Sequence, residues 1–270
     1  MNEYFDANRR HWDEVVPIHA ASDEYDVASF KAGKSKLKPI ELAELPDVRG
    51  KTMLHMQCHF GLDTLSWARE GAIVTGADFS EPALEQARAL AVETSIEARF
   101  VLSNVYELPE KLNGRFDIVF TSYGALNWLP DIEGWARVAA HFVKPGGTFY
   151  IAEFHPMASI FDDNAGATDL RILYPYFPLV EPMRFDDDGT YADLSAKLTH
   201  RTTYEWPHPI SEVVTALINA GLRVEFLHEF PFSIYQQLPF LVRTGEKMYR
   251  LPEHDGSVPL LYSIKATKDL

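Results

Sequence analysis

The stretch Thr52–Gly61 reads TMLHMQCHFG, a short apolar run that ends in a tight turn. After the turn, Leu62, Leu65 and Ala68 fall on one face of a helix, which Gly71 ends. The segment therefore predicts a strand, a turn and a helix. Such a unit needs further copies beside it, because a parallel sheet is stable only when helices cover both of its faces.

The same pattern repeats along the next part of the chain. Further short apolar strands are predicted over residues 72–78, 99–102, 116–122 and 148–154. Ser80 is a plausible N-cap for the helix after the first of these, with Pro82 in its first turn. A second helix is predicted over 131–143, and the KPGG turn at 144–147 ends it. This alternation indicates a mostly parallel α/β sheet.

Two flanking segments do not follow this rhythm. Residues 3–16 carry apolar side chains at helical spacing, and Pro17 is expected to end that helix because proline cannot continue the hydrogen-bond ladder. From residue 156 to 209 the helical rhythm stops, and Asp188-Gly189 is a hairpin signal between two strand-like runs. We expect a helical lid before the sheet and a cap inserted after its fifth strand.

The chain then returns to the sheet. Ser211 is expected to open a helix with Val213, Val214, Leu217 and Ile218 facing inward, and two final strands are predicted over 222–228 and 259–266. The expected organisation is a lid over 1–49, a core over 50–155, a cap over 156–209 and completion of the core sheet over 210–270.

Composition limits the partners. The chain of 270 residues has 39 acidic and 25 basic side chains, a formal charge of −14 that repels phosphate backbones, so no nucleic-acid partner is expected. No apolar stretch reaches the roughly 18 residues of a membrane span, and the first ten residues do not read as a secretion signal. The lone Cys58 excludes a disulfide framework. We expect a cytoplasmic protein that binds a small molecule and not a membrane.

Ligands of an open parallel sheet bind beyond the carboxyl ends of its strands. Four predicted strand ends carry informative residues: Gln57-Cys58-His59-Phe60-Gly61, Asp78, Ser103-Asn104-Val105 and Ser122-Tyr123-Gly124. Asp78 lies about twenty residues beyond Cys58, where an acid can accept hydrogen bonds from both hydroxyls of a ribose. Its plainer interpretation is a charge that complements the N-terminus of the next helix. Asn104, beside the apolar Val105, is suited to the edge and face of an adenine ring.

These residues resemble the class I S-adenosylmethionine-dependent methyltransferases. The pattern of that family runs from an LDLGCGxG-like loop, through an acid after the second strand, to a KPGG turn before the fifth, and the match covers about residues 50–155. The resemblance implies a Rossmann-like, doubly wound sheet of seven strands, mostly parallel, with its last strand antiparallel. It also implies methyl transfer to a small molecule, with S-adenosyl-L-methionine as the cofactor.

The resemblance also assigns the cofactor site. The amino-acid end of the cofactor is expected at residues 57–61, its ribose on Asp78 and its adenine beside Asn104. The cofactor-binding residues expected on this basis are Gln57, Cys58, His59, Gly61, Asp78, Phe79, Asn104, Val105 and Ser122.

The sequence departs from the family pattern in the first loop. His55 stands where the family usually has an acid, and Gln57 and His59 replace glycines that take positive φ or let the backbone approach a ligand. A protein that binds the cofactor without catalysis is therefore an alternative. A nicotinamide oxidoreductase is a weaker one, because the G-x-G-x-x-G fingerprint that a pyrophosphate needs is absent.

The methyl acceptor is expected over the same strand ends. His155, which follows the fifth strand, is the candidate general base because the ordinary pKa of histidine suits proton removal near neutral pH. Its alternative is a hydrogen-bonded structural histidine. The expected substrate-binding residues are Tyr123, Trp128, Trp12, His19 and Tyr25, each with core packing as its plainer role. No metal is expected, since nothing completes a tetrahedral site around the H-x-x-C-H run at 55–59.

Overall fold

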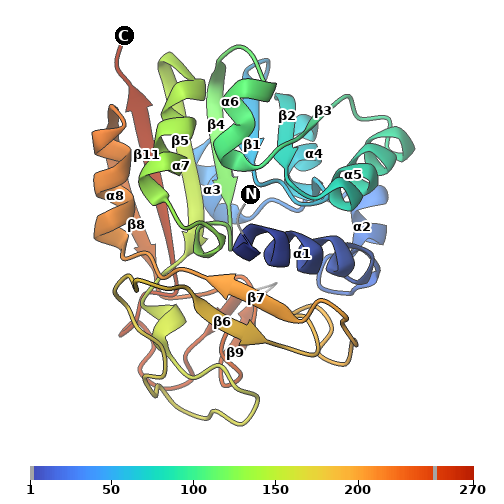
Figure 1. Ribbon diagram of the computed structural model, residues 1–270. Coiled ribbons are helices and arrows are strands. Elements are labelled where there is room, and N and C mark those ends of the chain that lie inside the picture. The colour runs from blue at the N-terminus through green and yellow to red at the C-terminus, as the bar shows by residue number, and fades with distance from the viewer. Residues whose placement is uncertain (1–2, 246–247) are drawn as a thin grey trace.

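The computed structural model describes residues 3–245 and 248–270. Its centre is a 7-stranded sheet with the order β3-β2-β1-β4-β5-β11-β8 (Figure 1). The strands are β1 (Thr52–Met56), β2 (Ile73–Asp78), β3 (Arg99–Leu102), β4 (Phe116–Ser122), β5 (Val143–Phe154), β8 (Leu222–Phe230) and β11 (Leu261–Lys268). Strand β11 pairs antiparallel with both of its neighbours, and the pairs from β3 to β5 are parallel. The predicted fold class, with its antiparallel last strand, is confirmed.

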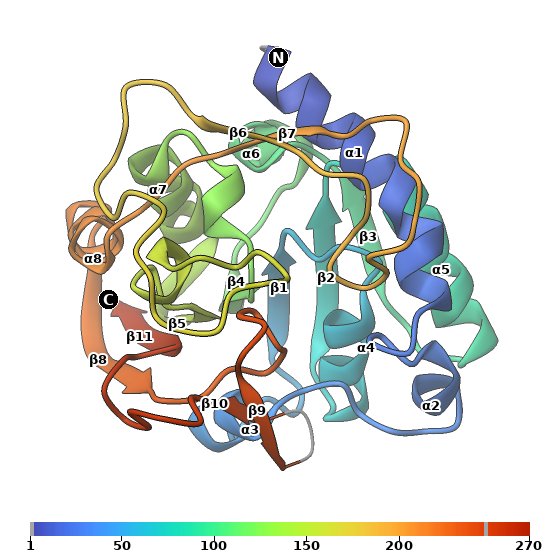
Figure 2. The ribbon, with the colours of Figure 1, turned by 90° about the horizontal axis from the view of Figure 1, so that it is seen from below.

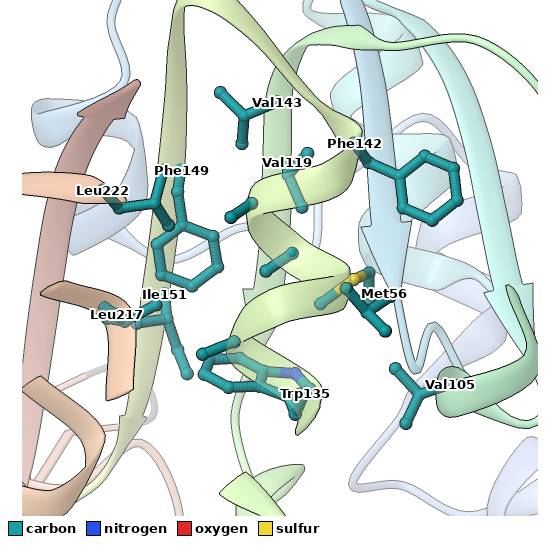
Figure 3. Packing of buried hydrophobic residues seen from close by; sticks show 14 of the residues in the cluster. Met56, Val105, Val119, Trp135, Phe142, Val143, Phe149, Ile151, Leu217 and Leu222 are labelled. Carbon is teal, nitrogen blue, oxygen red and sulfur yellow. The ribbon is translucent and has the colours of Figure 1, made fainter. Parts of the chain in front are cut away.

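Helices cover the two faces of this sheet. They are α3 (Pro39–Glu44), α4 (Leu62–Arg69), α5 (Glu81–Glu93), α6 (Leu108–Lys111), α7 (Ile132–Phe142) and α8 (Ile210–Asn219). Helices α7 and α8 share one apolar cluster with β1, β4, β5 and β11, and Figure 3 shows Trp135 of α7 beside Ile151 of the sheet. Trp135 and Phe149 pack edge to face, with ring centroids 5.6 Å apart. On the opposite face, Trp67 of α4 packs in a second cluster.

Local signals set the helix that follows β2. The Ser80 hydroxyl accepts a hydrogen bond from the backbone N–H of Ala83 at 3.3 Å, as the sequence predicts for an N-cap. The carboxylate of Asp131 caps α7 in the same way, at 2.7 Å from the nitrogen of Gly134. These caps begin both helices directly after a strand end or loop, so their N-termini lie near the carboxyl edge of the sheet.

Two predicted helix ends were wrong. Helix α1 (Glu3–Ala21) continues through Pro17, because the buried side chains of Val16 and His19 hold its last turn against the body of the protein. Helix α8 begins at Ile210, one residue before the predicted Ser211, with Pro209 at the N-cap position. Ile218 is 54% exposed and does not face inward, since its position lies beside the buried stripe rather than on it.

The cap contains a two-stranded antiparallel sheet of β6 (Met183–Asp186) and β7 (Thr202–Glu205). The expected tight hairpin at Asp188-Gly189 was wrong, because residues 187–201 form a long connection between these strands. This connection folds on itself, with Thr190 bridged to Asp193. Gly189 lies so close to the backbone of Leu194 that a Cβ there would be 2.6 Å from its oxygen. That close packing, and not a hairpin turn, requires the glycine.

A second segment outside the main sheet was not predicted. Between β8 and β11 the chain forms β9 (Val242–Gly245) and β10 (Met248–Arg250), a separate two-stranded sheet. The apolar side chains that flank this small sheet pack with those that follow β5 in one cluster: Ala158, Ile160, Phe161, Leu238, Leu241, Leu251 and Leu260. The cap therefore combines residues 156–209 with residues 231–260.

Helix α1 crosses the cap strands over the carboxyl edge of the sheet (Figure 2). The Asn8 side chain makes two hydrogen bonds of 2.8 Å with the backbone of Tyr204 in β7, one as donor and one as acceptor. The Glu14 carboxylate accepts two more, from the backbone nitrogens of Thr199 and His200 at 2.7 Å. Helix α1 and β7 thus cover this edge of the sheet together. We call these contacts between α1 and residues 199–204 the α1–β7 seam.

Candidate functional site

The loop after β1 has an unusual backbone. Gln57 and His59 both have positive φ angles, 59° and 50°, and Gly61 follows at 77°. A non-glycine residue in this region costs about 1–2 kcal/mol, so the surrounding contacts must hold it. Gly61 tolerates no side chain, because a Cβ would lie 3.0 Å from Ala87 and Phe100. The replacement of two family glycines thus leaves the expected backbone shape unchanged.

Asp78 at the end of β2 holds this loop. Its carboxylate accepts hydrogen bonds from the backbone nitrogens of His59 at 2.8 Å and Ser80 at 3.0 Å. Burial raises the pKa of Asp78 to about 6, against the lowering effect of these hydrogen bonds. The carboxylate also lines a small cavity and can accept hydrogen bonds from a ligand there.

That smaller cavity has a volume of about 130 Å³. It brings together residues predicted from separate strand ends, among them Asp78, Phe79, Asn104 and Val105. Asn104 accepts a hydrogen bond from the nitrogen of Tyr106 at 3.0 Å through Oδ1. Phe5, Asn8 and Trp12 of α1 close the cavity from the other side. Small-molecule sites usually occupy about 300–1,000 Å³, so this cavity accepts only part of a ligand unless α1 moves.

A larger cavity of about 490 Å³ lies between the strand ends and the cap. Gln57, His59, Tyr123 and Trp128 line both cavities, which are therefore neighbours. The predicted cofactor residues Cys58, Gly61 and Ser122 line only the larger one. The Gln57 amide donates to the carbonyl of Ala125 at 2.9 Å, while its buried Oε1 has no partner among the described residues. This oxygen is available to a donor group on a ligand.

His55 stands where the family usually has an acid, but its side chain is neutral. Its ring nitrogens contact the hydroxyls of Thr64 at 2.8 Å and Ser122 at 3.1 Å. Burial lowers the pKa of His55 to about 3, which keeps the ring neutral. A carboxylate is still present nearby, because Asp63 accepts a hydrogen bond from Ser122 at 3.3 Å and lines the larger cavity.

Two buried carboxylates shape the loop after β4. Glu153 accepts hydrogen bonds from the backbone nitrogens of Gly124, Ala125 at 2.8 Å and Leu126 at 3.2 Å. Glu41 of α3 accepts one from the Tyr123 hydroxyl at 2.8 Å and is 0% exposed. Burial raises the pKa of Glu153, and raises the pKa of Glu41 to about 7. The loop is fixed on both sides by acids that touch the cavity wall.

Aromatic side chains close the site from above. Trp12 packs edge to face against His59 and Trp128, with ring centroids 5.2 Å from each. The hydroxyl of Tyr25 hydrogen-bonds to the hydroxyl of Tyr191 in the cap, and both rings line both cavities. Of the predicted substrate-binding residues, Tyr123, Trp128, Trp12 and Tyr25 therefore meet at the cavities.

His19 does not line either cavity. It stacks on Tyr25, with ring centroids 5.2 Å apart, and its Nδ1 lies 3.2 Å from Nε2 of His59. Burial lowers the pKa of His19 to about 4. His19 thus lies behind the residues that line the cavities, and it supports two of them, His59 and Tyr25.

His155, the predicted general base, lies apart from the two cavities. The side chain is buried, its Nε2 lies 2.8 Å from a carboxylate oxygen of Glu229, and its Nδ1 accepts a hydrogen bond from the nitrogen of Met157 at 3.0 Å. Both ring nitrogens are thus occupied, and the residue lies outside the lining of both cavities. Glu153, Phe154 and Pro156 line the larger cavity, whereas His155, just after the end of β5, contacts Glu229 of β8.

The sequence missed the cap residues of the larger cavity. The principal ones are Asp163, Tyr174, Phe185, Asp187, Tyr191, Glu205, Trp206 and Tyr235. They come from irregular segments without periodicity, and the only sequence signal was their aromatic and acidic composition.

The described part of the chain has neither a cluster of metal ligands nor a membrane-spanning helix. Residues 3–245 and 248–270 contain no group of three or more His, Cys, Asp or Glu side chains that could hold a metal ion. Within the same ranges, none of the helices has the length and apolar character needed to cross a membrane.

The sequence and the fold resemble those of known proteins. Residues 53–147 match the family model described as a methyltransferase domain. A curated relative, the ubiquinone biosynthesis O-methyltransferase of Escherichia coli O127:H6, is 30% identical over 156 residues. That match covers 52% of this chain and 65% of the relative, slightly less than two thirds of its length.

Solved structures extend the likeness over most of the chain. An S-adenosylmethionine-dependent methyltransferase from Mesorhizobium loti superimposes with a TM-score of 0.59 at 22% identity, covering 88% of this chain and all 100% of that one. The magnesium protoporphyrin IX methyltransferase from Synechocystis PCC 6803, solved with bound S-adenosylhomocysteine, has a TM-score of 0.51 at 13% identity and covers 96% and 100%. The chain has the fold of the class I S-adenosylmethionine-dependent methyltransferases. This likeness in fold rests on the solved structures, and the match to the methyltransferase domain model is confined to residues 53–147.

Proposed function

We propose that this protein is an S-adenosyl-L-methionine-dependent methyltransferase that acts on a small molecule. The observation that carries the proposal is the position of the Asp78 carboxylate. It holds the left-handed loop after β1 and faces a cavity that continues into a larger one under the cap. The family match and the O-methyltransferase relative support the same activity.

The residues of both cavities fit this cofactor. Asp78 is suited to accept hydrogen bonds from the two ribose hydroxyls, and the apolar side chains of Phe79 and Val105 to pack on the adenine. The unpartnered Oε1 of Gln57 is suited to a donor on the amino-acid end. Oδ1 of Asn104 is engaged by Tyr106, so its amide nitrogen is the group available to a ring nitrogen. When bound, the cofactor supplies an electrophilic methyl group on a sulfonium.

The protein's own contribution is alignment and exclusion of water. Glu153 fixes the backbone of the loop after β4, and Glu41 fixes the Tyr123 side chain, so the wall between the two cavities is rigid. Trp12, Tyr25 and Tyr191 cover the site. An in-line displacement gains most from such positioning, because correct alignment replaces the entropy that two free reactants would lose.

Calorimetric titration of the purified protein tests this proposal. S-adenosylhomocysteine should bind, and NAD should not, because the loop lacks the glycines that a pyrophosphate needs. Binding of NAD alone would refute the assignment. Binding of S-adenosylhomocysteine without turnover in a broad acceptor screen would favour a non-catalytic binding protein.

A further inference from the structure

The lining of the larger cavity is more acidic than basic. The cap contributes the carboxylates of Asp163, Asp187 and Glu205, and the rest of the lining contributes those of Glu24, Asp63 and Glu153. The lysines of the lining, Lys36 and Lys38, come from the segment before α3. A ligand that enters beneath the cap therefore meets negative charge.

Those lysines are engaged with the protein itself. The Lys36 ammonium lies 3.3 Å from the Asp26 carboxylate and 2.6 Å from the Ser29 hydroxyl. The Lys38 ammonium donates to the carbonyl oxygen of Lys36 at 2.7 Å. His208, which also lines the cavity, has its ring nitrogens at Glu212 and at the carbonyl of Leu129. These contacts leave the acids of the lining, three of them from the cap, as the main charged feature that a ligand would meet.

Glu205 is an acid of the cap that contacts the segment after β4. Its Oε2 accepts a hydrogen bond from the Asn127 side chain at 2.9 Å, and the Asn127 carbonyl accepts one from the nitrogen of Trp206 at 2.8 Å. Asn127 belongs to the short helix η2 (Leu126–Trp128), whose Trp128 lines both cavities. The carboxylate is thus tied to the segment that separates the two cavities.

The surroundings of Glu205 are aromatic. Tyr174, Phe185, Tyr191, Trp206 and Tyr235 contribute to the same lining. The faces of such rings attract cations, and their area accepts apolar groups. A carboxylate or phosphate would meet, among the lining residues that the structure describes, only the two engaged lysines and a surplus of acids.

From this arrangement we propose that the methyl acceptor is an amine that carries an aromatic or similarly large apolar group, with its nitrogen bound by Glu205 in the larger cavity. The proposal rests on the proposed methyltransferase function and names the class of its substrate. The ammonium form is bound as a cation. It can pass one proton to the Glu205 carboxylate, which leaves a neutral amine with a free lone pair and a carboxylic acid on the protein.

The titration of Glu205 supports this role. Burial raises the pKa of Glu205 to about 7, the Asn127 hydrogen bond opposes the rise, and the charges of Asp163 and Asp187 add to it. Tyr235 is a further titratable group whose pKa is affected by the charge of Glu205. A carboxylate that titrates near neutral pH can exchange a proton with an amine at working pH.

Calorimetry on the intact protein saturated with S-adenosylhomocysteine tests the proposal with two matched probes. Phenethylamine and 3-phenylpropionate share a phenyl ring and a two-carbon chain but carry opposite charges. Phenethylamine should bind, and 3-phenylpropionate should not. Glu205→Gln should raise the dissociation constant for phenethylamine at least tenfold, and Glu205→Asp should restore part of the affinity because it keeps the charge.

Glu253→Gln is the matched control, because it removes one exposed acid of the same chain outside both cavities. It should leave the affinity for phenethylamine unchanged. Thermal melts with and without S-adenosylhomocysteine check that each variant is folded.

Three results would overturn the amine assignment: tighter binding of 3-phenylpropionate, equal binding of phenethylamine by wild type and Glu205→Gln, or binding of neither probe. In each of these cases bound S-adenosylhomocysteine leaves the methyltransferase proposal standing. Failure of S-adenosylhomocysteine itself to bind refutes both proposals.

Discussion

The backbone N–H of His59 donates a hydrogen bond of 2.8 Å to the carboxylate of Asp78, which joins the carboxyl ends of β1 and β2. Through this contact, one acid both stabilises a left-handed non-glycine residue and faces the cavity. The loop therefore does not need the glycine that His59 replaces. The hydrogen bond that holds its positive φ angle comes from Asp78, the same acid that is expected to bind the ribose of the cofactor.

Replacing Asp78 tests the cofactor site. Asp78→Asn should raise the dissociation constant for S-adenosylhomocysteine about 10- to 100-fold, because hydrogen bonds to a charged acceptor contribute about 1.5–3 kcal/mol. The amide keeps one oxygen for the loop, so the far-ultraviolet circular dichroism should not change. Asp47→Asn, which alters an exposed acid, is the control. Unchanged affinity would refute the ribose assignment.

The affinity for S-adenosylhomocysteine should depend on pH. Ribose hydroxyls donate to the ionised carboxylate, and the pKa of Asp78 in the ligand-free protein is raised to about 6 by burial. The affinity should therefore fall as the pH decreases through 6. Titrations at pH 5, 6, 7 and 8 measure this, and Asp78→Asn should show a flatter profile over the same range. A wild-type profile as flat as that of the variant contradicts the assignment.

Glu41 should make the protein less stable as the pH rises. Burial raises the pKa of Glu41 to about 7 in the folded state, whereas an unfolded chain ionises near 4.5. The folded state binds more protons between these values, so this contribution to the free energy of unfolding falls as the pH rises through that window.

The variant Glu41→Gln removes this dependence and keeps an acceptor for Tyr123 or for the nitrogen of Lys38. Relative to wild type, its free energy of unfolding should increase between pH 5 and pH 8, by about 3 kcal/mol at most, since one pKa unit corresponds to about 1.4 kcal/mol. Urea denaturation at the two pH values gives the difference. A difference that stays constant with pH would show that Glu41 is ionised throughout.

His155 should matter for stability and not for turnover. His155→Gln breaks the contact with Glu229 and the hydrogen bond from the nitrogen of Met157. We expect a loss of about 1–3 kcal/mol in the free energy of unfolding. The affinity for S-adenosylhomocysteine should not change, nor should kcat once an acceptor is known. A large fall in kcat with unchanged stability would show that His155 takes part in the reaction.

The α1–β7 seam should control exchange of the cofactor. Asn8→Ala removes both hydrogen bonds to the backbone of Tyr204 and leaves the Glu14 contacts in place. Because α1 closes the smaller cavity, we expect S-adenosylhomocysteine to dissociate several-fold faster from this variant in stopped-flow displacement. Arg10→Ala, on the same helix and exposed, is the control. Equal dissociation rates would show that the cofactor leaves by another path.

The periodicity of the sequence determined the core sheet and the carboxyl edge where its ligands lie. Alternating strands and helices between Thr52 and Phe154 depend on local patterning, caps and turn residues such as Ser80, and these signals do not need distant contacts. Asp78, Asn104 and Tyr123 could be assigned because parallel strands bring their carboxyl ends to one edge.

Only the tertiary structure decided what covers that edge. The cap draws on residues 156–209 and 231–260, whose contacts are long-range and leave no periodic pattern in the sequence. His155 was predicted at the site because it directly follows β5, whereas in the structure its ring contacts Glu229. The fold also brought Glu205 to Asn127 across 78 positions. Local sequence carries backbone preference, but which side chains meet across a cavity depends on how separate segments pack.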